Sequence, residues 1–180
     1  MREARDDLDA VVKAYAADEP VVLVAHSLGG AYATTYASDH VARVQGLVLV
    51  DPTPFGFFEE QRRIIGEAQY HRSRTSALSR LTGMVRAEYE AMSHSLTTAW
   101  EARRALRGGT LLSAGRIENP DGVVGGRAKA AWLRLHQQLA DALGLEHVVV
   151  ADGGHRLQDA SPGMVVAAIR RVALRQGSAP

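Results

Sequence analysis

Short apolar runs alternate with helical segments along this chain, and this alternation limits the folds open to it. Helical spacing of apolar residues predicts helices over 3–16, 30–39 and 128–143, and another that begins at Ser161-Pro162. The runs between them are dominated by Val, Leu and Ala, as in Val21-Val22-Leu23-Val24-Ala25, with no polar alternation. Such strands are typical of parallel sheets with helices on both faces. The sequence predicts an α/β fold with about four parallel strands, at 21–25, 44–50, 110–114 and 146–151.

Residues 54–107 differ from the rest of the chain, because strand-like runs disappear and Arg, Glu, Ser and Ala dominate. Two to four helices are predicted there, for example over 59–70 and 85–104. We interpret 54–107 as a helical cap or lid, inserted into an α/β core that comprises 1–53 and 108–180.

Composition excludes several classes of function. The 180 residues include no cysteine, so a thiolate nucleophile, a disulfide framework and a cysteine-ligated metal are excluded. The formal net charge of +1, with no local block of basic residues, argues against nucleic-acid binding. No nucleotide-binding motif and no paired-histidine motif is present, so we expect neither a cofactor nor a metal. The apolar runs are too short to span a membrane and no signal peptide is visible, so we expect a cytoplasmic protein.

The segment Ala25-His26-Ser27-Leu28-Gly29-Gly30 carries the strongest functional signal. A buried strand runs into a serine with very small residues two positions to either side, and a helix follows. A sharp strand-to-helix turn would hold Ser27 strained with its hydroxyl exposed, and anything beyond a methyl at Ala25 or Gly29 would crowd it. The segment resembles the nucleophile elbow of the α/β-hydrolase family, with Ala25 where that family usually has Gly. The resemblance implies a partial α/β-hydrolase fold and a serine nucleophile.

A serine nucleophile needs a base, and His155 is the best of seven histidines. His155 ends Ala151-Asp152-Gly153-Gly154-His155, between the last strand and the last helix, where the family places its catalytic histidine. We interpret His26 as a pocket or packing residue, because adjacent side chains on such a turn point apart. The other five are interpreted as surface or satisfied histidines: His40, His71, His94, His136 and His147.

The acid of the triad is ambiguous in the sequence. Asp51 ends the second strand, at the carboxyl edge of the sheet where ligands bind. The family more often takes its acid from the loop after the next strand, which here offers Glu118 and Asp121. No acid follows that strand immediately, and some hydrolases that resemble this chain use the Asp51 position. We therefore favour Asp51 and keep Asp121 and Glu118 as alternatives.

All three phenylalanines, Phe55, Phe57 and Phe58, follow Asp51-Pro52. They are expected either to line an apolar pocket for an acyl or aromatic group or to pack within the cap. Trp100 and Trp132 are interpreted as core or cap-packing residues.

The sequence therefore predicts a serine hydrolase that acts on a small ester-like substrate through Ser27, His155 and Asp51, with the Leu28 N–H as an oxyanion donor. The resemblance covers only the later part of the family's fold, and the part that usually supplies a second oxyanion donor has no counterpart here. Impaired catalysis and a homodimer through the exposed edge of strand 21–25 are expected for that reason. Two alternatives stay open: acyl transfer or cofactor-free perhydrolysis at the same triad, and a non-catalytic remnant that binds a ligand or partner.

Overall fold

The computed structural model describes residues 2–17, 19–106, 108–116 and 122–174. Its centre is a single parallel sheet in which the four strands lie side by side in chain order. This confirms the predicted α/β class and the four parallel strands. The strands are β1 (Val21–His26), β2 (Val44–Val50), β3 (Gly109–Ala114) and β4 (Glu146–Val150).

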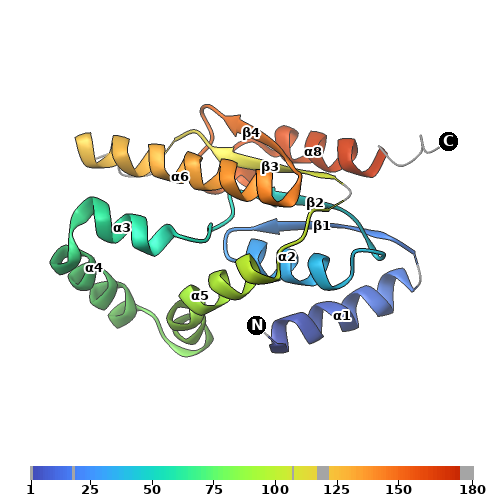
Figure 1. The fold of residues 1–180 in the computed structure, drawn as a ribbon, viewed down its shortest axis with the longest axis horizontal. Coiled ribbons are helices and arrows are strands. Elements are labelled where there is room, and N and C mark those ends of the chain that lie inside the picture. Colours follow the sequence, from blue (N-terminus) through green and yellow to red (C-terminus); the bar gives the residue numbers. More distant parts are fainter. Residues whose placement is uncertain (1, 18, 107, 117–121, 175–180) are drawn as a thin grey trace.

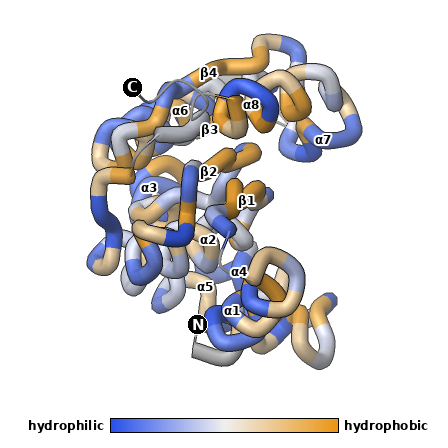
Figure 2. Tube along the Cα trace, turned by 90° about the vertical axis from the view of Figure 1, so that its right-hand side faces the viewer, coloured by the Kyte–Doolittle hydropathy of each residue, from blue (hydrophilic) through white to orange (hydrophobic). Residues whose placement is uncertain are grey.

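Helices cover both faces of the sheet (Figure 1). On one face, α1 (Arg2–Ala16), α2 (Gly29–Asp39) and α6 (Gly122–Leu143) share a hydrophobic cluster with the strands. On the other face, α8 (Pro162–Leu174) packs on β2 and β3 through a second cluster, and the short α7 (Leu157–Ala160) precedes it. Figure 2 shows the strands as hydrophobic segments between these layers. Burial of both sheet faces is the main stabilising contribution to such a fold.

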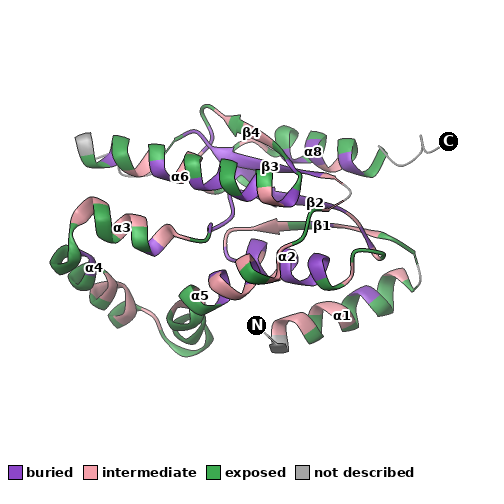
Figure 3. Ribbon diagram, viewed as in Figure 1, coloured by how far each residue is buried: buried purple, intermediate pink, exposed green. Residues whose placement is uncertain are grey.

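Three helices connect β2 to β3: α3 (Phe57–Ile65), α4 (Glu67–Arg80) and α5 (Gly83–Ala102). They extend away from the sheet and are mostly exposed or half-buried (Figure 3). A third hydrophobic cluster joins them to α2 and includes Leu28, Phe58, Tyr70 and Leu96. The segment 54–107, predicted to be helical, is therefore helical over most of its described length.

The structure corrects two predictions. The strands were expected to be buried on both faces; β2 and β3 are, but β1 and β4 lie at the two edges of the sheet, and Val24 and Val149 each remain 46 % exposed. The flanking helices centre on the middle strands and leave part of each edge strand uncovered. The predicted loop over 115–127 is also too long, because α6 begins at Gly122 rather than at Ala128. Two adjacent glycines, at 125 and 126, hid the start of this helix, since Gly is unfavourable within helices but tolerated there.

Candidate active site

Ser27 lies in a tight turn between β1 and α2. Its φ of +54° is in the left-handed region, which non-glycine residues adopt only when the surroundings enforce it. The neighbouring strand enforces it here: the Ser27 N–H donates to the Val50 carbonyl at 3.2 Å, and the Ser27 carbonyl accepts from the Thr53 N–H at 3.1 Å. The turn after β1 is thus tied to the turn after β2 through backbone bonds on both sides of Ser27.

Gly30 lets these two turns approach closely. A Cβ at Gly30 would lie 2.7 Å from the Cβ of Pro52, well inside van der Waals contact, whereas a Cβ at Gly29 would lie 3.9 Å from its nearest neighbour, Ala25. The second glycine of the pair is therefore the one that packing requires.

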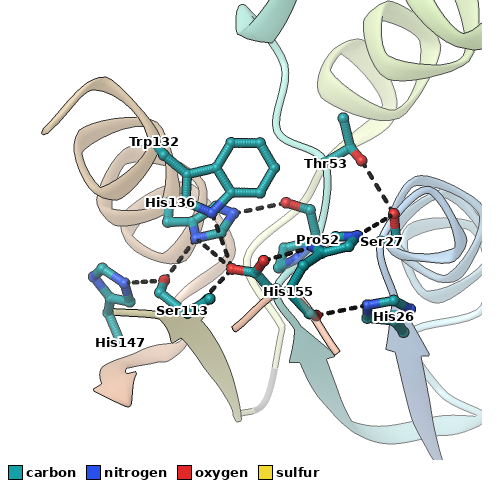
Figure 4. Close-up of polar contacts among 11 residues, drawn as sticks. His26, Ser27, Pro52, Thr53, Ser113, Trp132, His136, His147 and His155 are labelled. Carbon is teal, nitrogen blue, oxygen red and sulfur yellow. Dashed lines mark hydrogen bonds and ion pairs between the residues drawn. The ribbon is translucent and has the colours of Figure 1, made fainter. Parts of the chain in front are cut away.

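His155 lies in the loop after β4, with its side chain directed at Ser27 (Figure 4). Its Nε2 is 3.2 Å from Ser27 Oγ, and its Nδ1 is 2.7 Å from Asp51 Oδ2. A carboxylate only accepts, so the Nδ1–H donates to Asp51 and the bare Nε2 accepts the Ser27 hydroxyl proton. His26 holds the same loop, because its Nε2 lies 2.9 Å from the His155 carbonyl oxygen and donates to it.

Asp51 is almost completely buried, at 2 % exposure, and its φ of +42° is also left-handed. While Oδ2 accepts from His155, Oδ1 accepts from the Ala114 N–H at 2.8 Å and from the Trp132 indole N–H at 2.9 Å. Burial by itself would raise the pKa of Asp51, but these three hydrogen bonds outweigh burial and hold its pKa below the usual value. Asp51 is therefore an anion throughout the neutral range.

The structure brings Ser27, His155 and Asp51 into one hydrogen-bonded chain. The two alternative acids, Glu118 and Asp121, lie outside the described residues. Among the described residues, no group of three or more His, Asp or Glu side chains could hold a metal ion. No helix in the described ranges is long and apolar enough to cross a bilayer.

Several residues around the site were not predicted from the sequence to belong to it, and Trp132 was interpreted there as a core or cap-packing residue. Trp132 and the Ala114 N–H hold Asp51, and Thr53 Oγ1 lies 3.5 Å from Ser27 Oγ. Trp132 and His136 are one helical turn apart on α6, with ring centroids 4.8 Å apart. In the sequence, these two polar aromatic residues stand at i and i+4 on an otherwise apolar helix face. That spacing was the sequence signal that could have pointed to them as part of a polar site.

A cavity of about 340 Å³ lies beside His155, between α3 and α6. Its wall is mainly apolar, with Phe57, Ile64 and Leu135 among the lining residues, and Glu60, Gln61 and Arg116 add polar groups. Of the candidate pocket residues, only Phe57 lines this cavity. Phe58 is buried against Tyr70, Phe55 stacks on Trp100 at 5.2 Å, and His26 contacts the His155 loop.

A family model described as alpha/beta hydrolase fold matches residues 1–138, more than half of the chain. The chain belongs to the α/β-hydrolase family. Solved α/β-hydrolase-like structures cover almost all of it, although at low identity. One is a carboxylesterase from Nitrososphaera gargenis, with 12 % identity and a TM-score of 0.59 over 99 % of this chain and 73 % of that one.

Two proteins from Pseudomonas aeruginosa are also similar in fold. A probable hydrolytic enzyme has 16 % identity and a TM-score of 0.54 over 95 % of this chain and 68 % of that one. The second, a hydrolase, has 15 % identity and a TM-score of 0.51 over 94 % of this chain and 70 % of that one. These likenesses establish the α/β-hydrolase fold and leave the substrate open. A comparison with curated protein sequences gave no significant match.

Proposed function

We propose that this α/β-hydrolase is a serine hydrolase that cleaves ester-like carbonyl compounds, with Ser27 as nucleophile, His155 as base and Asp51 as the acid that orients His155. The observation that supports this most is the unbroken chain of contacts from Ser27 Oγ to His155 Nε2 at 3.2 Å and from His155 Nδ1 to Asp51 Oδ2 at 2.7 Å. The three residues come from three separate turns at one edge of the sheet, where parallel sheets bind ligands.

In the proposed reaction, Ser27 Oγ attacks the carbonyl carbon as its proton passes to His155 Nε2. Asp51 stabilises the resulting imidazolium without taking its proton. His155 then returns the proton to the leaving oxygen as the carbon–oxygen bond breaks, which gives an acyl-enzyme and a free alcohol. Water, activated by the same nitrogen, adds to the acyl carbon and releases the acid.

The Leu28 N–H is the proposed oxyanion donor. Leu28 directly precedes α2, whose N-terminal amides favour negative charge. Within the described part of the chain, no backbone carbonyl accepts from the Leu28 N–H. One donor of this kind typically contributes about 10²–10³-fold to the rate.

The cavity beside His155 suggests where the substrate's apolar part binds. His155, which must protonate the leaving oxygen, is among the residues that line this cavity, and we place the leaving group there for that reason. Phe57 and Trp132 contact edge to face there, with centroids 5.3 Å apart. We therefore propose an ester of an apolar or aromatic alcohol as the substrate class.

Hydrolysis of a p-nitrophenyl ester tests the proposed function. We expect turnover by the wild type and none above background by Ser27→Ala, with the fold of the variant unchanged because the Ser27 hydroxyl is not part of the core. Ser93→Ala, at an exposed serine on α5, is the matched control and should retain wild-type turnover. Equal turnover by wild type and Ser27→Ala would refute the assignment of the nucleophile.

A further inference from the structure

Behind the proposed triad lies a second polar cluster that the reaction does not use. Its members are Ser113 on β3, His136 on α6, and His147 on β4. Ser113 and His136 are both 0 % exposed. His136 Nε2 lies 2.6 Å from the Pro52 carbonyl oxygen and its Nδ1 lies 2.6 Å from Ser113 Oγ, while His147 Nε2 contacts the same Ser113 Oγ at 2.6 Å (Figure 4).

One carbonyl fixes the direction of these hydrogen bonds. The Pro52 oxygen can only accept, so His136 must carry its proton on Nε2. A neutral His136 then has a bare Nδ1, which accepts from the Ser113 hydroxyl. Ser113 Oγ also lies 2.6 Å from His147 Nε2, and the other nitrogen of His147, Nδ1, lies 2.8 Å from Gln137 Oε1. Both ring nitrogens of His136 are therefore satisfied while His136 is neutral, as burial requires.

This cluster is not a second catalytic triad. A triad needs the serine on one imidazole nitrogen and the acid on the other. Here Ser113 and Asp51 both face His136 Nδ1, the latter at 3.9 Å, and Nε2 is occupied by Pro52. Ser113 is also inaccessible to a substrate. The cluster can act only through its neighbours.

Those neighbours are the groups that place Asp51. The carbonyl that His136 holds belongs to Pro52, the residue after Asp51 in a turn whose backbone is left-handed at Asp51. Two backbone bonds also hold this turn: the Asp51 N–H donates to the Leu112 carbonyl, and the Thr53 N–H donates to the Ser27 carbonyl. His136 also packs on Trp132, which donates to Asp51 Oδ1. Pro52 has no N–H, so its carbonyl oxygen is the only backbone group of Pro52 that can form a hydrogen bond.

We propose that His136 is a positioning residue for the triad: as a neutral Nε2–H tautomer backed by Ser113, it fixes the Pro52 turn and Trp132 so that Asp51 Oδ2 stays aimed at His155. This inference rests on the proposed function, because it assigns His136 a part in the same reaction. It gives a buried histidine beside the triad a role that does not require contact with the substrate.

His136 must be neutral to position Asp51 in this way. A protonated His136 would place a positive charge 3.9 Å from Asp51 Oδ1 and would weaken the stabilisation that Asp51 gives to the His155 imidazolium. It would also lack the bare nitrogen that accepts from Ser113. Burial lowers the pKa of His136 to about 4, against opposing effects of Pro52 and Asp51, which keeps the ring neutral above that pH.

The test compares two substitutions at His136 in the full chain. His136→Phe keeps a ring against Trp132 but loses the bond to Pro52, whereas His136→Gln can still present an N–H donor there. We expect His136→Phe to lower kcat for a p-nitrophenyl ester by roughly 10–10²-fold with KM nearly unchanged, as for a misplaced catalytic group. His136→Gln should recover most of that loss. His94→Phe, at an exposed histidine on α5, should have no effect.

A folded His136→Phe variant with wild-type kcat would overturn the inference, as would a loss of kcat that His136→Gln does not relieve. If His136→Phe does not fold, nitrogen-15 NMR of the histidines in the wild type decides. We expect one neutral Nε2–H ring that does not titrate between pH 5 and 8, assigned to His136 by its loss in His136→Gln. An Nδ1–H tautomer, or titration of that ring within this range, would overturn the inference. Failure of the proposed function would give a different result from failure of this inference, because ester turnover would then be the same in the wild type and in Ser27→Ala.

Discussion

The buried His136 should make the folded protein sensitive to acid by a predictable amount. Its pKa is about 4 in the folded state, against an ordinary 6.5. Between these values the unfolded chain binds a proton that the folded chain does not, so stability falls as pH falls. The stabilisation is complete above pH 6.5 and is lost progressively toward pH 4. From pH 7.5 to 5 the linkage relation gives a loss of about 2 kcal/mol from this one group.

Urea unfolding at pH 7.5 and 5, followed by circular dichroism, measures this loss. The His136→Gln variant has no titrating group at position 136. As the pH is lowered from 7.5 to 5, its free energy of unfolding should therefore fall by about 2 kcal/mol less than that of the wild type. Other titrating groups, including the partly buried His147 whose pKa burial also lowers, remain in both proteins and cancel to first order in the comparison. Equal pH dependence in the two proteins would refute the placement of a neutral, buried histidine behind the site.

Three further predictions concern the elements around Ser27. Asp51→Asn should lower kcat by roughly 10⁴-fold, as in the serine-protease triad. The donors Ala114 and Trp132 will hold the amide oxygen and turn the NH₂ toward His155 Nδ1, which forces the wrong tautomer; a mild effect on ester turnover would contradict this. Gly30→Ala should destabilise the fold by about 1–3 kcal/mol in urea titrations because its methyl meets Pro52, whereas Gly29→Ala should be tolerated; similar values for both would contradict the packing argument. The 180-residue chain should dimerise or aggregate through the β1 edge, and a monodisperse monomer by light scattering would count against that prediction.

The architecture was accessible from the sequence because hydrophobic patterning reports burial directly. Continuous apolar runs located all four strands, and the family match and the sheet order confirm the predicted fold. The exposure of Val24 and Val149 could not be predicted, since a strand's position at a sheet edge depends on the order of strands rather than on its own residues.

The site was accessible only in part. Strand ends and small residues pointed to Ser27, Asp51 and His155, and their catalytic roles stay a prediction. The spacing of Trp132 and His136 on α6 was a signal in the sequence, but their link to Asp51 was not, because Trp132 and the Ala114 N–H reach Asp51 from segments 81 and 63 residues away. His136 was interpreted as a surface or satisfied histidine, and the structure shows it satisfied and fully buried. Its partners, a proline carbonyl and a serine on β3, carry no local sequence signal.

The central claim is that Ser27 is an activated nucleophile, and covalent labelling tests it most directly. A fluorophosphonate probe reacts with a serine whose hydroxyl is deprotonated by a neighbouring base. Mass spectrometry of the digested protein should show one modified serine, Ser27, with labelling absent in Ser27→Ala and strongly reduced in a His155→Ala variant. Labelling at another serine, or no labelling of the folded wild type at all, would contradict the account.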